Sequence, residues 1–197
     1  MTGAGATKGE RTRRRILDAA AEVLAEQGVE GASVAAIAAR AELRPGSLYF
    51  HFPSRTALVE AAIREAVGRA SARVAEAVGE ASGDPVAALR RAVGAHVRAL
   101  DELGAYGALV LRDDAGLPDE LARERNRLLA EYAGTWAAIV AAAQRAGALP
   151  PGPPPLVAEL LIGAMNSGLR RDGRPAHDAT ERTATLLALL RLDARIE

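Results

Sequence analysis

Residues 44–55 read RPGSLYFHFPSR and place a Pro-Gly pair, a hydroxyl, a histidine and three aromatic side chains within twelve positions. The whole chain has only two Phe and three Tyr, and both Phe and one of the Tyr fall in this stretch. Such a concentration in an alanine-rich chain indicates either a small local core or a recognition surface. We expect it to be both.

The composition favours an all-α protein. The 197-residue chain is rich in Ala, Leu, Arg and Glu, which have high helix propensity, and it lacks strand-like alternation of β-branched or aromatic residues. Its length allows one compact domain or two small ones. Without cysteine it can form neither a disulfide framework nor a thiolate metal site, and we expect no metal and no cofactor. A polar N-terminus and the absence of a long uncharged run predict a soluble cytoplasmic protein with no membrane partner.

Net charge does not by itself point to nucleic acid. The chain has 25 Lys and Arg against 25 Asp and Glu, whereas a nucleic-acid-binding domain is often strongly basic. Positive charge is instead local, because residues 8–15, KGERTRRR, carry five positive charges against one negative. Such a run alone is more typical of a solvated tail, so the case for DNA depends on the helices that come after this run.

Four helices are predicted in the first 80 residues, after a tail at residues 1–9 that we expect to be disordered. Apolar residues recur on one face of each helix. Gly28 is a stop signal for the first. Ser33 and Ser54 are N-caps of the second and fourth, and Pro45 fits the first turn of the third. The expected helices span residues 12–28, 33–41, 45–51 and 54–80.

The second and third helices, separated by about four residues, form a helix-turn-helix arrangement at about residues 33–52. The major groove of B-DNA admits one helix, so a reading helix must protrude while its neighbours support it. Leu48 and Phe52 are four residues apart and would anchor the third helix inward. The positions left facing outward or sideways are Ser47, Tyr49, Phe50 and His51.

These residues carry a family resemblance. The string ILDAAAEVLAEQGVEGASVAAIAARAELRPGSLYFHFPSRTALVEAA resembles the N-terminal domain of the tetracycline-repressor (TetR) family of bacterial transcriptional regulators, over about residues 12–65. Its most specific part is GSLYFHFPSR-x-x-L. The resemblance implies a helix-turn-helix DNA-binding domain at residues 10–56 and a ligand-binding and dimerisation domain at 57–197, linked by the helix at 54–80. It also implies a ligand-released repressor that binds a (pseudo)palindromic operator as a homodimer.

The resemblance implies a set of DNA contacts, at Arg13, Arg14, Ser33, Arg44, Pro45, Gly46, Ser47, Tyr49, Phe50, His51 and Arg55. Arg13 and Arg14 precede the first helix and could reach a phosphate or the minor groove. Tyr49 and His51 would hydrogen-bond the DNA backbone, although Tyr49 could be a core residue and His51 an ordinary surface histidine. Arg55 stands where the family usually has lysine and adds a cation to a helix N-terminus.

Other members of the set would read the operator. Ser33 and Arg44 would touch phosphates, and residues 45–47 would enter the major groove. Contacts to base edges carry sequence information and phosphate contacts do not, so we assign specificity to Arg44, Ser47 and Phe50. An exposed aromatic ring such as Phe50 can contact a thymine methyl group.

The sequence departs from the family pattern at three positions. Glu42 replaces the glycine usual in the turn, Arg44 replaces a capping Ser or Thr, and Ala36 lacks a carboxylate that often completes the cap of the second helix. We expect Glu42 to adopt a left-handed conformation at some cost. These changes put affinity and operator sequence in doubt, but not the fold.

Beyond residue 80 the chain is expected to be helical at residues 85–103, 105–112, 118–146, 154–170 and 178–195, for about nine helices in all. The segment from WAAIV to RDGRP (136–175) is weakly similar to subfamilies that sense acyl-coenzyme A, which implies a small apolar or acyl-type effector. The candidate pocket residues are Val110, Tyr132, Trp136, Met165, Asn166, Arg170 and Arg171. Tyr132, Trp136 and Met165 are more often core residues. Asn166 is either a pocket hydrogen-bonding group or an interface amide, and we expect His96 to be structural.

The last two helices are expected to hold the dimer together. The second offers more apolar surface than one face of a monomer needs, at Leu186, Leu187, Leu189, Leu190 and Leu192. Two other classes of protein remain as alternatives. One is a helical interaction module that does not bind DNA. The other is an enzyme, although no nucleophile–base pair, glycine-rich phosphate loop or metal-ligand spacing is apparent.

Overall fold

Residues 7–111, 117–167 and 177–192 are described by the computed structural model, and they form nine α-helices without a strand, which confirms the all-α expectation. In chain order the helices are α1 (Lys8–Gly31), α2 (Val34–Arg40), α3 (Pro45–Tyr49), α4 (Arg55–Gly79), α5 (Pro85–Leu103), α6 (Ala105–Leu111), α7 (Asp119–Arg145), α8 (Pro154–Asn166) and α9 (Ala179–Leu189). Among these residues no helix combines the length and apolarity that crossing a membrane requires.

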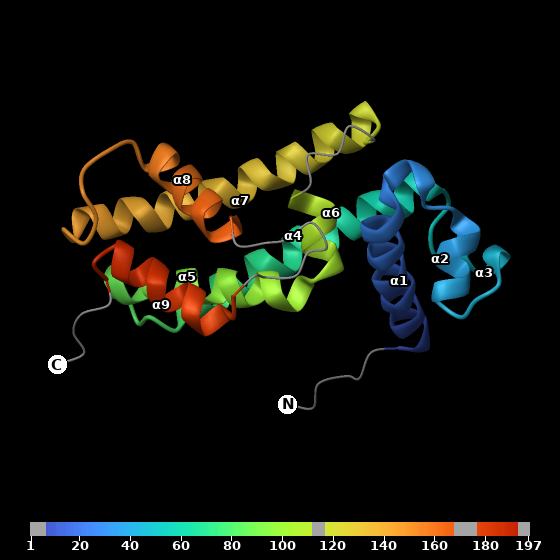
Figure 1. Ribbon diagram of the computed structural model, residues 1–197, viewed down its shortest axis with the longest axis horizontal. Helices are drawn as coiled ribbons and strands as arrows, with labels where there is room; N and C mark the ends of the chain where they lie inside the picture. The colour runs from blue at the N-terminus through green and yellow to red at the C-terminus, as the bar shows by residue number, and fades with distance from the viewer. Residues whose placement is uncertain (1–6, 112–116, 168–176, 193–197) are drawn as a thin grey trace.

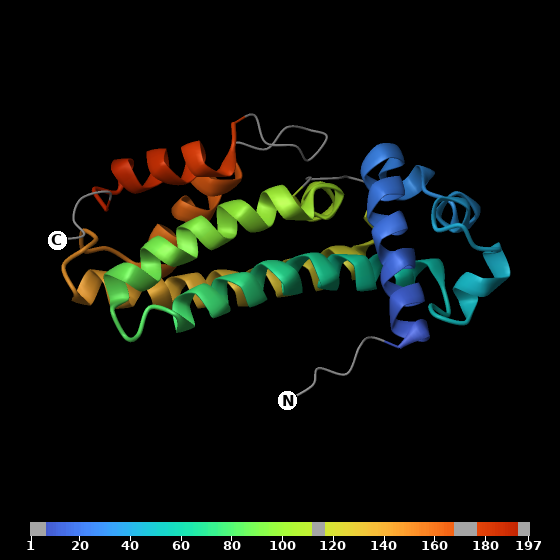
Figure 2. The same cartoon turned by 90° about the horizontal axis from the view of Figure 1, so that it is seen from below.

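The molecule is elongated, with α1, α2 and α3 gathered at one end of the long helix α4 (Figure 1). We call these three helices and the first turns of α4 the head, and the remaining helices the body. Helix α1 crosses the direction of α4 and α5, which run along the length of the molecule (Figure 2). The buried face of α4 continues from Leu58 in the head to Val74 in the body, so one helix contributes to both cores.

Helix α1 begins at Lys8, four residues before the expected start. Thr7 and Glu10 form a capping box: the Thr7 hydroxyl accepts from the Glu10 N–H at 3.2 Å, and the Thr7 N–H donates to the Glu10 carboxylate at 2.7 Å. The expectation of a disordered tail is therefore wrong for residues 7–9, while residues 1–6 lie outside the described part of the chain. The basic run at 8–15 is carried on a helix.

The turn after α2 sets the position of α3. The Ser33 hydroxyl accepts from the Ala36 N–H at 3.0 Å, which confirms the expected N-cap of α2. After the helix, Glu42 has a φ of 54°, and the Leu43 N–H donates to the Ala38 carbonyl at 2.9 Å. This is a Schellman motif with glutamate at the position where glycine is preferred. The expected left-handed conformation of Glu42 is confirmed.

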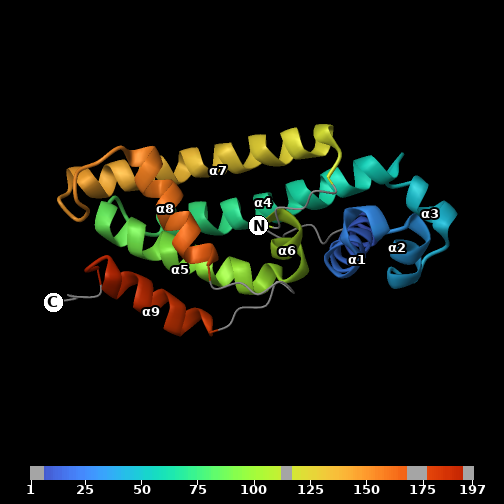
Figure 3. The same ribbon diagram turned by 45° about the horizontal axis from the view of Figure 1, so that its top comes forward.

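In the body, α5 packs against α4 and α7, α8 lies across α7 and α5, and α9 lies along α5 (Figure 3). Asp84 and Ser54 cap the starts of α5 and α4 through backbone N–H groups of the first turn. Gly104, with a φ of 46°, separates α5 from α6. Helix α6 therefore turns back and packs against both α1 and α4.

Helix α9 ends at Leu189, short of the expected end at residue 195. Arg191 has a φ of 57°, and the N–H of the buried Leu192 donates to the Leu187 carbonyl at 2.8 Å, which makes a second Schellman motif. Burial of Leu192 in the core explains why the chain turns inward here. Helix α8 is described to Asn166, and its expected extension to residue 170 lies outside the described residues.

Candidate functional site

Helix α3 points its large side chains in opposite directions. Leu48 and Phe52 are only 2% and 3% exposed, which confirms their role as inward anchors. Phe50 is 93% exposed and Tyr49 55% exposed. The helix ends at Tyr49, two residues before the expected end near residue 51, and Pro53 prevents any continuation beyond Phe52. The stretch is thus a local core on one side and an open surface on the other.

The start of α3 is accessible from outside. Arg44, Pro45 and Gly46 are all exposed, and Arg44 gives the helix no side-chain cap. A Cβ added to Gly46 would meet no atom within 4 Å, so internal packing does not require glycine there. The missing side chain instead leaves room for an external partner to approach the backbone. Ser33 is also exposed, although its hydroxyl already caps α2.

Arg13 is bound within the head. Its guanidinium lies 4.2 Å from the centre of the Phe52 ring, and its Nη1 donates to the His51 carbonyl oxygen at 3.1 Å. The cation–π contact and the hydrogen bond tie the first turns of α1 to the end of α3. They also fix the backbone of the half-buried His51. The structure therefore gives Arg13 a positioning role that the sequence did not indicate.

Arg55 is also engaged internally. Its Nε donates to the Ala32 carbonyl at 2.9 Å, and its Nη2 is buried without a hydrogen-bond partner in the described part of the chain. This side chain links the start of α4 to the turn between α1 and α2. Arg14 lines a groove with Glu65 and Arg69 of α4. Arg13, Arg14 and Arg55 are the expected DNA-contacting arginines that lie outside α2, α3 and the turn between them. Two of the three, Arg13 and Arg55, make hydrogen bonds within the head.

Arg40, which the sequence did not mark as functional, joins α2 to α1. Its guanidinium pairs with Glu22 at 2.8 Å and with Glu26 at 2.7 Å. All three side chains are exposed, and exposed ion pairs contribute little stability individually. A forked pair to two carboxylates nevertheless restricts the angle between the two helices.

One polar cluster joins the head to the body. Asp18 of α1 accepts a hydrogen bond from the Tyr106 hydroxyl of α6 at 2.8 Å and pairs with Arg69 of α4 at 3.3 Å. The Arg69 guanidinium also lies over the Tyr106 ring, 4.7 Å from its centre. Burial and the hydrogen bond to Asp18 raise the pKa of Tyr106, so its hydroxyl remains a donor. Three helices thus meet at one carboxylate.

A cavity of about 50 Å³ lies in the body, bounded by α4, α5, α6, α7 and α8. Val110, Tyr132 and Asn166, three of the expected pocket residues, line it. Apart from His96, Tyr132 and Asn166, its described lining residues are apolar or glycine. The space is several times what one water molecule needs, about 10–15 Å³ on the same measure, so it can hold several groups of that size.

Three polar side chains meet at the wall of this cavity. The buried His96 places Nδ1 2.7 Å from the Tyr132 hydroxyl and Nε2 3.0 Å from the Asn166 Oδ1. Burial lowers the pKa of His96 to about 4 and raises that of Tyr132 to about 12, so both groups are neutral near pH 7. The Trp136 indole packs edge-on against both rings. The three helices α5, α7 and α8 are thereby connected.

The structure separates the expected pocket residues into three groups. Trp136 and Met165 are 0% and 1% exposed and do not line the cavity, so they belong to the core behind it. Arg170 and Arg171 lie outside the described residues. His96, by contrast, was expected to be structural and lies at the cavity wall. Its partners are 36 and 70 residues away in the chain, so no local pattern indicated them.

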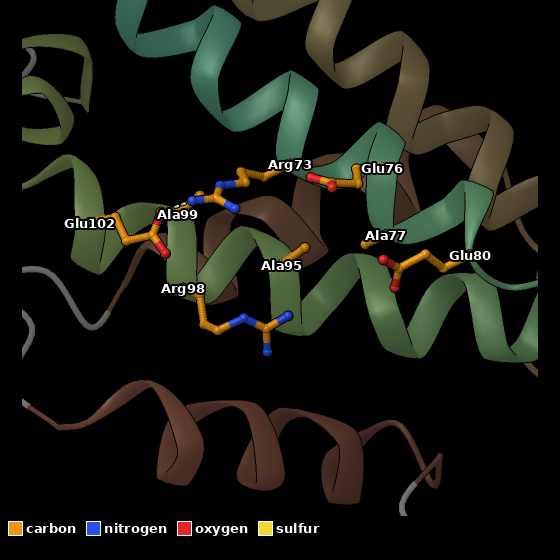
Figure 4. A pocket seen from close by; sticks show the side chains of 8 residues that line it. All are labelled: Arg73, Glu76, Ala77, Glu80, Ala95, Arg98, Ala99 and Glu102. Carbon is orange, nitrogen blue, oxygen red and sulfur yellow. Dashed lines mark hydrogen bonds and ion pairs between the residues drawn. The ribbon is translucent and has the colours of Figure 1, made fainter. Parts of the chain in front are cut away.

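A groove of about 190 Å³ runs along the surface between α4 and α5 (Figure 4). Charged side chains of both signs project into it from the two helices (Figure 4). Arg73 pairs with Glu102 at 2.9 Å, and Glu80 pairs with Arg91 at 2.9 Å. The groove therefore offers a ligand neither strong net charge nor an apolar floor. In the described part of the chain, no three His, Asp or Glu side chains are grouped to hold a metal ion.

Helices α8 and α9 carry an apolar surface that the single chain leaves open. Leu156 and Leu160 of α8 are 50% and 66% exposed, and Leu189 of α9 is 77% exposed. The small residues Gly163 and Ala164 are also exposed on α8. The other leucines of the expected interface pack against the core because they face into the body: Leu186, Leu187, Leu190 and Leu192.

Two family models match the chain. Residues 16–62 match the model described as bacterial regulatory proteins, tetR family. Residues 82–190 match the model of the tetracyclin repressor-like C-terminal domain, and this match covers more than half of the chain. The first match contains α2, α3 and most of α1, and the second contains the helices that enclose most of the cavity.

Individual proteins agree with these matches. The HTH-type transcriptional regulator UidR of Escherichia coli K12 is 45% identical over 67 residues, which are 34% of this chain and 34% of the relative, so the chain spans about a third of it. The TetR family regulator PfmR of Thermus thermophilus superposes with a TM-score of 0.74 at 23% identity, over 94% of this chain and 97% of that one. The regulator FadR of Bacillus subtilis, solved with stearoyl-CoA, has a TM-score of 0.74 at 21% identity, over 92% and 99%. At these identities the two structures show a shared fold.

Proposed function

Since the chain belongs to the tetR family of bacterial regulatory proteins, and so is a helix-turn-helix transcriptional regulator, we propose that it is a repressor that an effector releases from its operator. It acts as a homodimer on a (pseudo)palindromic site and carries no enzymatic activity of its own. The DNA-binding domain comprises residues 10–56, and the ligand-binding and dimerisation domain comprises residues 57–197. Helix α4 belongs to both.

The exposure of Phe50 carries the DNA-binding part of the proposal. Phe50 is 93% exposed, so its ring contributes no buried apolar area to the stability of the fold. The two residues that anchor this segment, Leu48 and Phe52, are buried on either side of it in the sequence. In the major groove its ring would contact a thymine methyl group. Tyr49 and His51 bind phosphates on either side, and Arg44 and Ser47 contribute to sequence preference.

The test is a gel shift with the DNA that flanks the gene of this protein. Tyr49→Ala should weaken binding to all operator variants by a similar factor of about ten, because a hydrogen bond to a charged phosphate carries no base information. Ser47→Ala should instead change the preference among variants. Thr135→Ala, at an exposed position of α7 outside both the head and the proposed α8–α9 interface, is the control. If Tyr49→Ala binds the operator as tightly as the parent chain, the assignment of Tyr49 to a phosphate contact is wrong. If the parent chain binds none of the flanking DNA, the proposal that it represses its own neighbourhood is refuted.

The dimer is proposed to form through α8 and α9. Leu156, Leu160 and Leu189 remain exposed, and Gly163 and Ala164 allow another helix to approach closely. Two-fold symmetry would place two copies of α3 at half-sites one helical turn or more apart. Analytical ultracentrifugation at micromolar concentration should show a dimer, and Leu160→Glu with Leu189→Glu should show a monomer. A monomeric parent chain would refute the arrangement.

The cavity is proposed as the effector site because two of its walls lead to the head. Helix α4 lines the cavity and begins beside α3. Helix α6 lines it through Val110 and is bound to α1 through Tyr106 and Asp18. An effector that fits only one spacing of these helices shifts the DNA-binding equilibrium by its difference in affinity for the two states. Couplings of about 1–3 kcal/mol correspond to a 5- to 150-fold loss of operator affinity.

The effector is proposed to be small and apolar or acyl-type. The cavity wall is apolar apart from three neutral groups, and the structurally similar FadR was solved with stearoyl-CoA. If the effector is an acyl-coenzyme A, Arg170 and Arg171 are candidates for binding its phosphates. Replacing both by Ala should then abolish release by acyl-coenzyme A and leave operator binding unchanged. Unchanged release in the double variant would remove the acyl-coenzyme A idea.

A further inference from the structure

The polar side chains at the cavity wall do not satisfy one another completely. The Asn166 Oδ1 can only accept, so Nε2 of the neutral His96 donates to it, and Nδ1 accepts the Tyr132 proton. The proton of the Tyr132 hydroxyl is thereby used. The Asn166 amide nitrogen, in contrast, has two N–H donors and no hydrogen-bond partner in the described part of the chain. Asn166 is one of the residues that line the cavity.

In the described part of the chain, the same wall offers no positive charge. None of its described residues is charged. Burial lowers the pKa of His96 to about 4, so the imidazole is not a cation at neutral pH either. Arg182, whose charge acts on His96, is already engaged: its Nη1 donates to Asp101 at 2.8 Å and its Nη2 to the Met165 carbonyl at 2.8 Å. An anion entering the cavity would lose its hydration without gaining a partner of opposite charge, which is costly.

We infer that the cavity binds a short aliphatic ligand through an uncharged carbonyl group, as in a ketone, an ester or an acyl thioester, and that it discriminates against free carboxylates. The carbonyl oxygen accepts from the Asn166 amide, and the aliphatic chain lies against the apolar walls from α4 and α6. A ligand pocket of this kind uses few polar groups to fix orientation and apolar surface for affinity. The inference rests on the proposed function only in expecting that the ligand releases DNA.

The first experiment compares ligands of equal carbon number. Trp136 is the single tryptophan of the chain and packs edge-on against His96 and Tyr132, so its fluorescence reports occupancy of the cavity. The full chain is titrated with methyl butyl ketone, hexanoate, hexane and hexanoyl-coenzyme A. At least one of the two carbonyl probes should bind about tenfold or more tightly than hexanoate, since the buried carboxylate lacks a counter-charge. The inference would be overturned if hexanoate bound as tightly as both carbonyl probes, or if neither carbonyl probe gave a saturable change in fluorescence.

The second experiment tests the amide. Asn166→Leu removes both donors, and Asn166→Asp removes them with almost no change of shape. Each variant should bind methyl butyl ketone about three- to tenfold more weakly, the effect of one hydrogen bond, while its affinity for hexane does not fall. Ser167→Ala, the exposed neighbour, is the control and should match the parent chain. Equal weakening of ketone and hexane in both variants would reduce Asn166 to a structural residue and refute the inference.

Two further comparisons identify which class of molecule supplies the carbonyl group and whether the site regulates DNA binding. Hexanoyl-coenzyme A binding much more tightly than the ketone identifies an acyl thioester as the source. Similar affinities identify a free ketone or ester. A gel shift with each probe then tests the regulatory step. Ketone binding without operator release supports the ligand class and refutes the proposed switch, whereas a preference for hexanoate with operator release supports the switch and refutes the ligand class.

Discussion

The head and the body build their proposed binding sites, for DNA and for the effector, in opposite ways. In the head, the side chains proposed to meet DNA come mainly from one continuous stretch, residues 44–55, and the largest of them are exposed. In the body, the polar groups of the cavity come from three helices, separated by 36 and 70 residues, and His96 is buried. Both regions contain a histidine and a tyrosine at their centre, yet only in the body do these two bond to each other.

The difference follows from the shape of the partner. A single helix fits the major groove, so one local segment can provide a reading surface if its other face is anchored. A cavity must be enclosed, and enclosure needs walls from several helices. Recognition in the head therefore depends on local sequence, whereas recognition in the body depends on how the helices pack.

The sharpest test of this contrast compares the two phenylalanines of the head. Phe52→Ala should lower the free energy of unfolding by about 3–5 kcal/mol, because it empties a buried site and removes the surface on which Arg13 stacks. Phe50→Ala should change it by less than about 0.5 kcal/mol while weakening operator binding. Denaturant unfolding and a gel shift on the same preparations measure both. Comparable losses of stability would show that Phe50 is not a free surface residue.

Burial of His96 makes the stability of the body depend on pH. In the unfolded chain the pKa of His96 is about 6.5, and burial lowers it to about 4 in the folded protein, so the unfolded state binds more protons between these values. Stability from this residue is complete above about pH 6.5 and falls by about 2 kcal/mol at pH 5. His96→Gln should remove this part of the loss, and denaturant unfolding at pH 5 and pH 7 measures it. Parallel stability curves for the parent chain and His96→Gln would contradict the prediction.

The junction between head and body can be weakened without touching either site. Tyr106→Phe keeps the ring under Arg69 but removes the hydrogen bond to Asp18, and should cost about 1.5 kcal/mol of unfolding free energy. Operator release by the effector should also weaken, because α6 loses its bond to α1. Tyr49→Phe, which alters an exposed hydroxyl, is the control for stability. Normal release by Tyr106→Phe would place the coupling in α4 alone.

The smallest expected effect concerns two helix ends of the same geometry. Glu42→Gly should stabilise the head by up to about 1 kcal/mol, because the left-handed conformation at this position suits glycine. Gly147 follows α7 with a φ of 74°, and Gly147→Ala should destabilise the body by a similar amount. Thermal unfolding of the two variants measures both. A loss of stability in Glu42→Gly would mean that the glutamate side chain has a compensating contact.

The sequence predicted most of the head because its signals are local. Ser33, Ser54 and Pro45 are each sufficient to mark a helix start, and the spacing of Leu48 and Phe52 identified the inward face of α3. The early start of α1 was missed, although its capping box is also a local pattern. The internal hydrogen bonds of Arg13 and Arg55 could not be predicted, because their acceptors are carbonyl groups 38 and 23 residues away.

In the body the sequence predicted the helices that bound the cavity, but only part of its lining. Val110, Tyr132 and Asn166 do line it. Trp136 and Met165 lie on the same helices and face the core instead, because apolar periodicity does not distinguish a cavity wall from a packed interior. His96 was discounted because a lone histidine on an apolar face is usually structural. Its importance depends on two partners that only the packing of α5, α7 and α8 brings together.

The internal bonds of Arg13 and Arg55 have a consequence for how the protein responds to ionic strength. DNA binding releases counterions in proportion to the number of phosphates that the protein newly neutralises. Arg13 and Arg55 each donate one hydrogen bond to a carbonyl oxygen of the head. A cation that keeps such a bond on the DNA and does not contact a phosphate lowers the steepness of the logarithmic salt dependence by about 0.9. We therefore expect the affinity for an operator to vary less with ionic strength than the number of arginines in the head suggests.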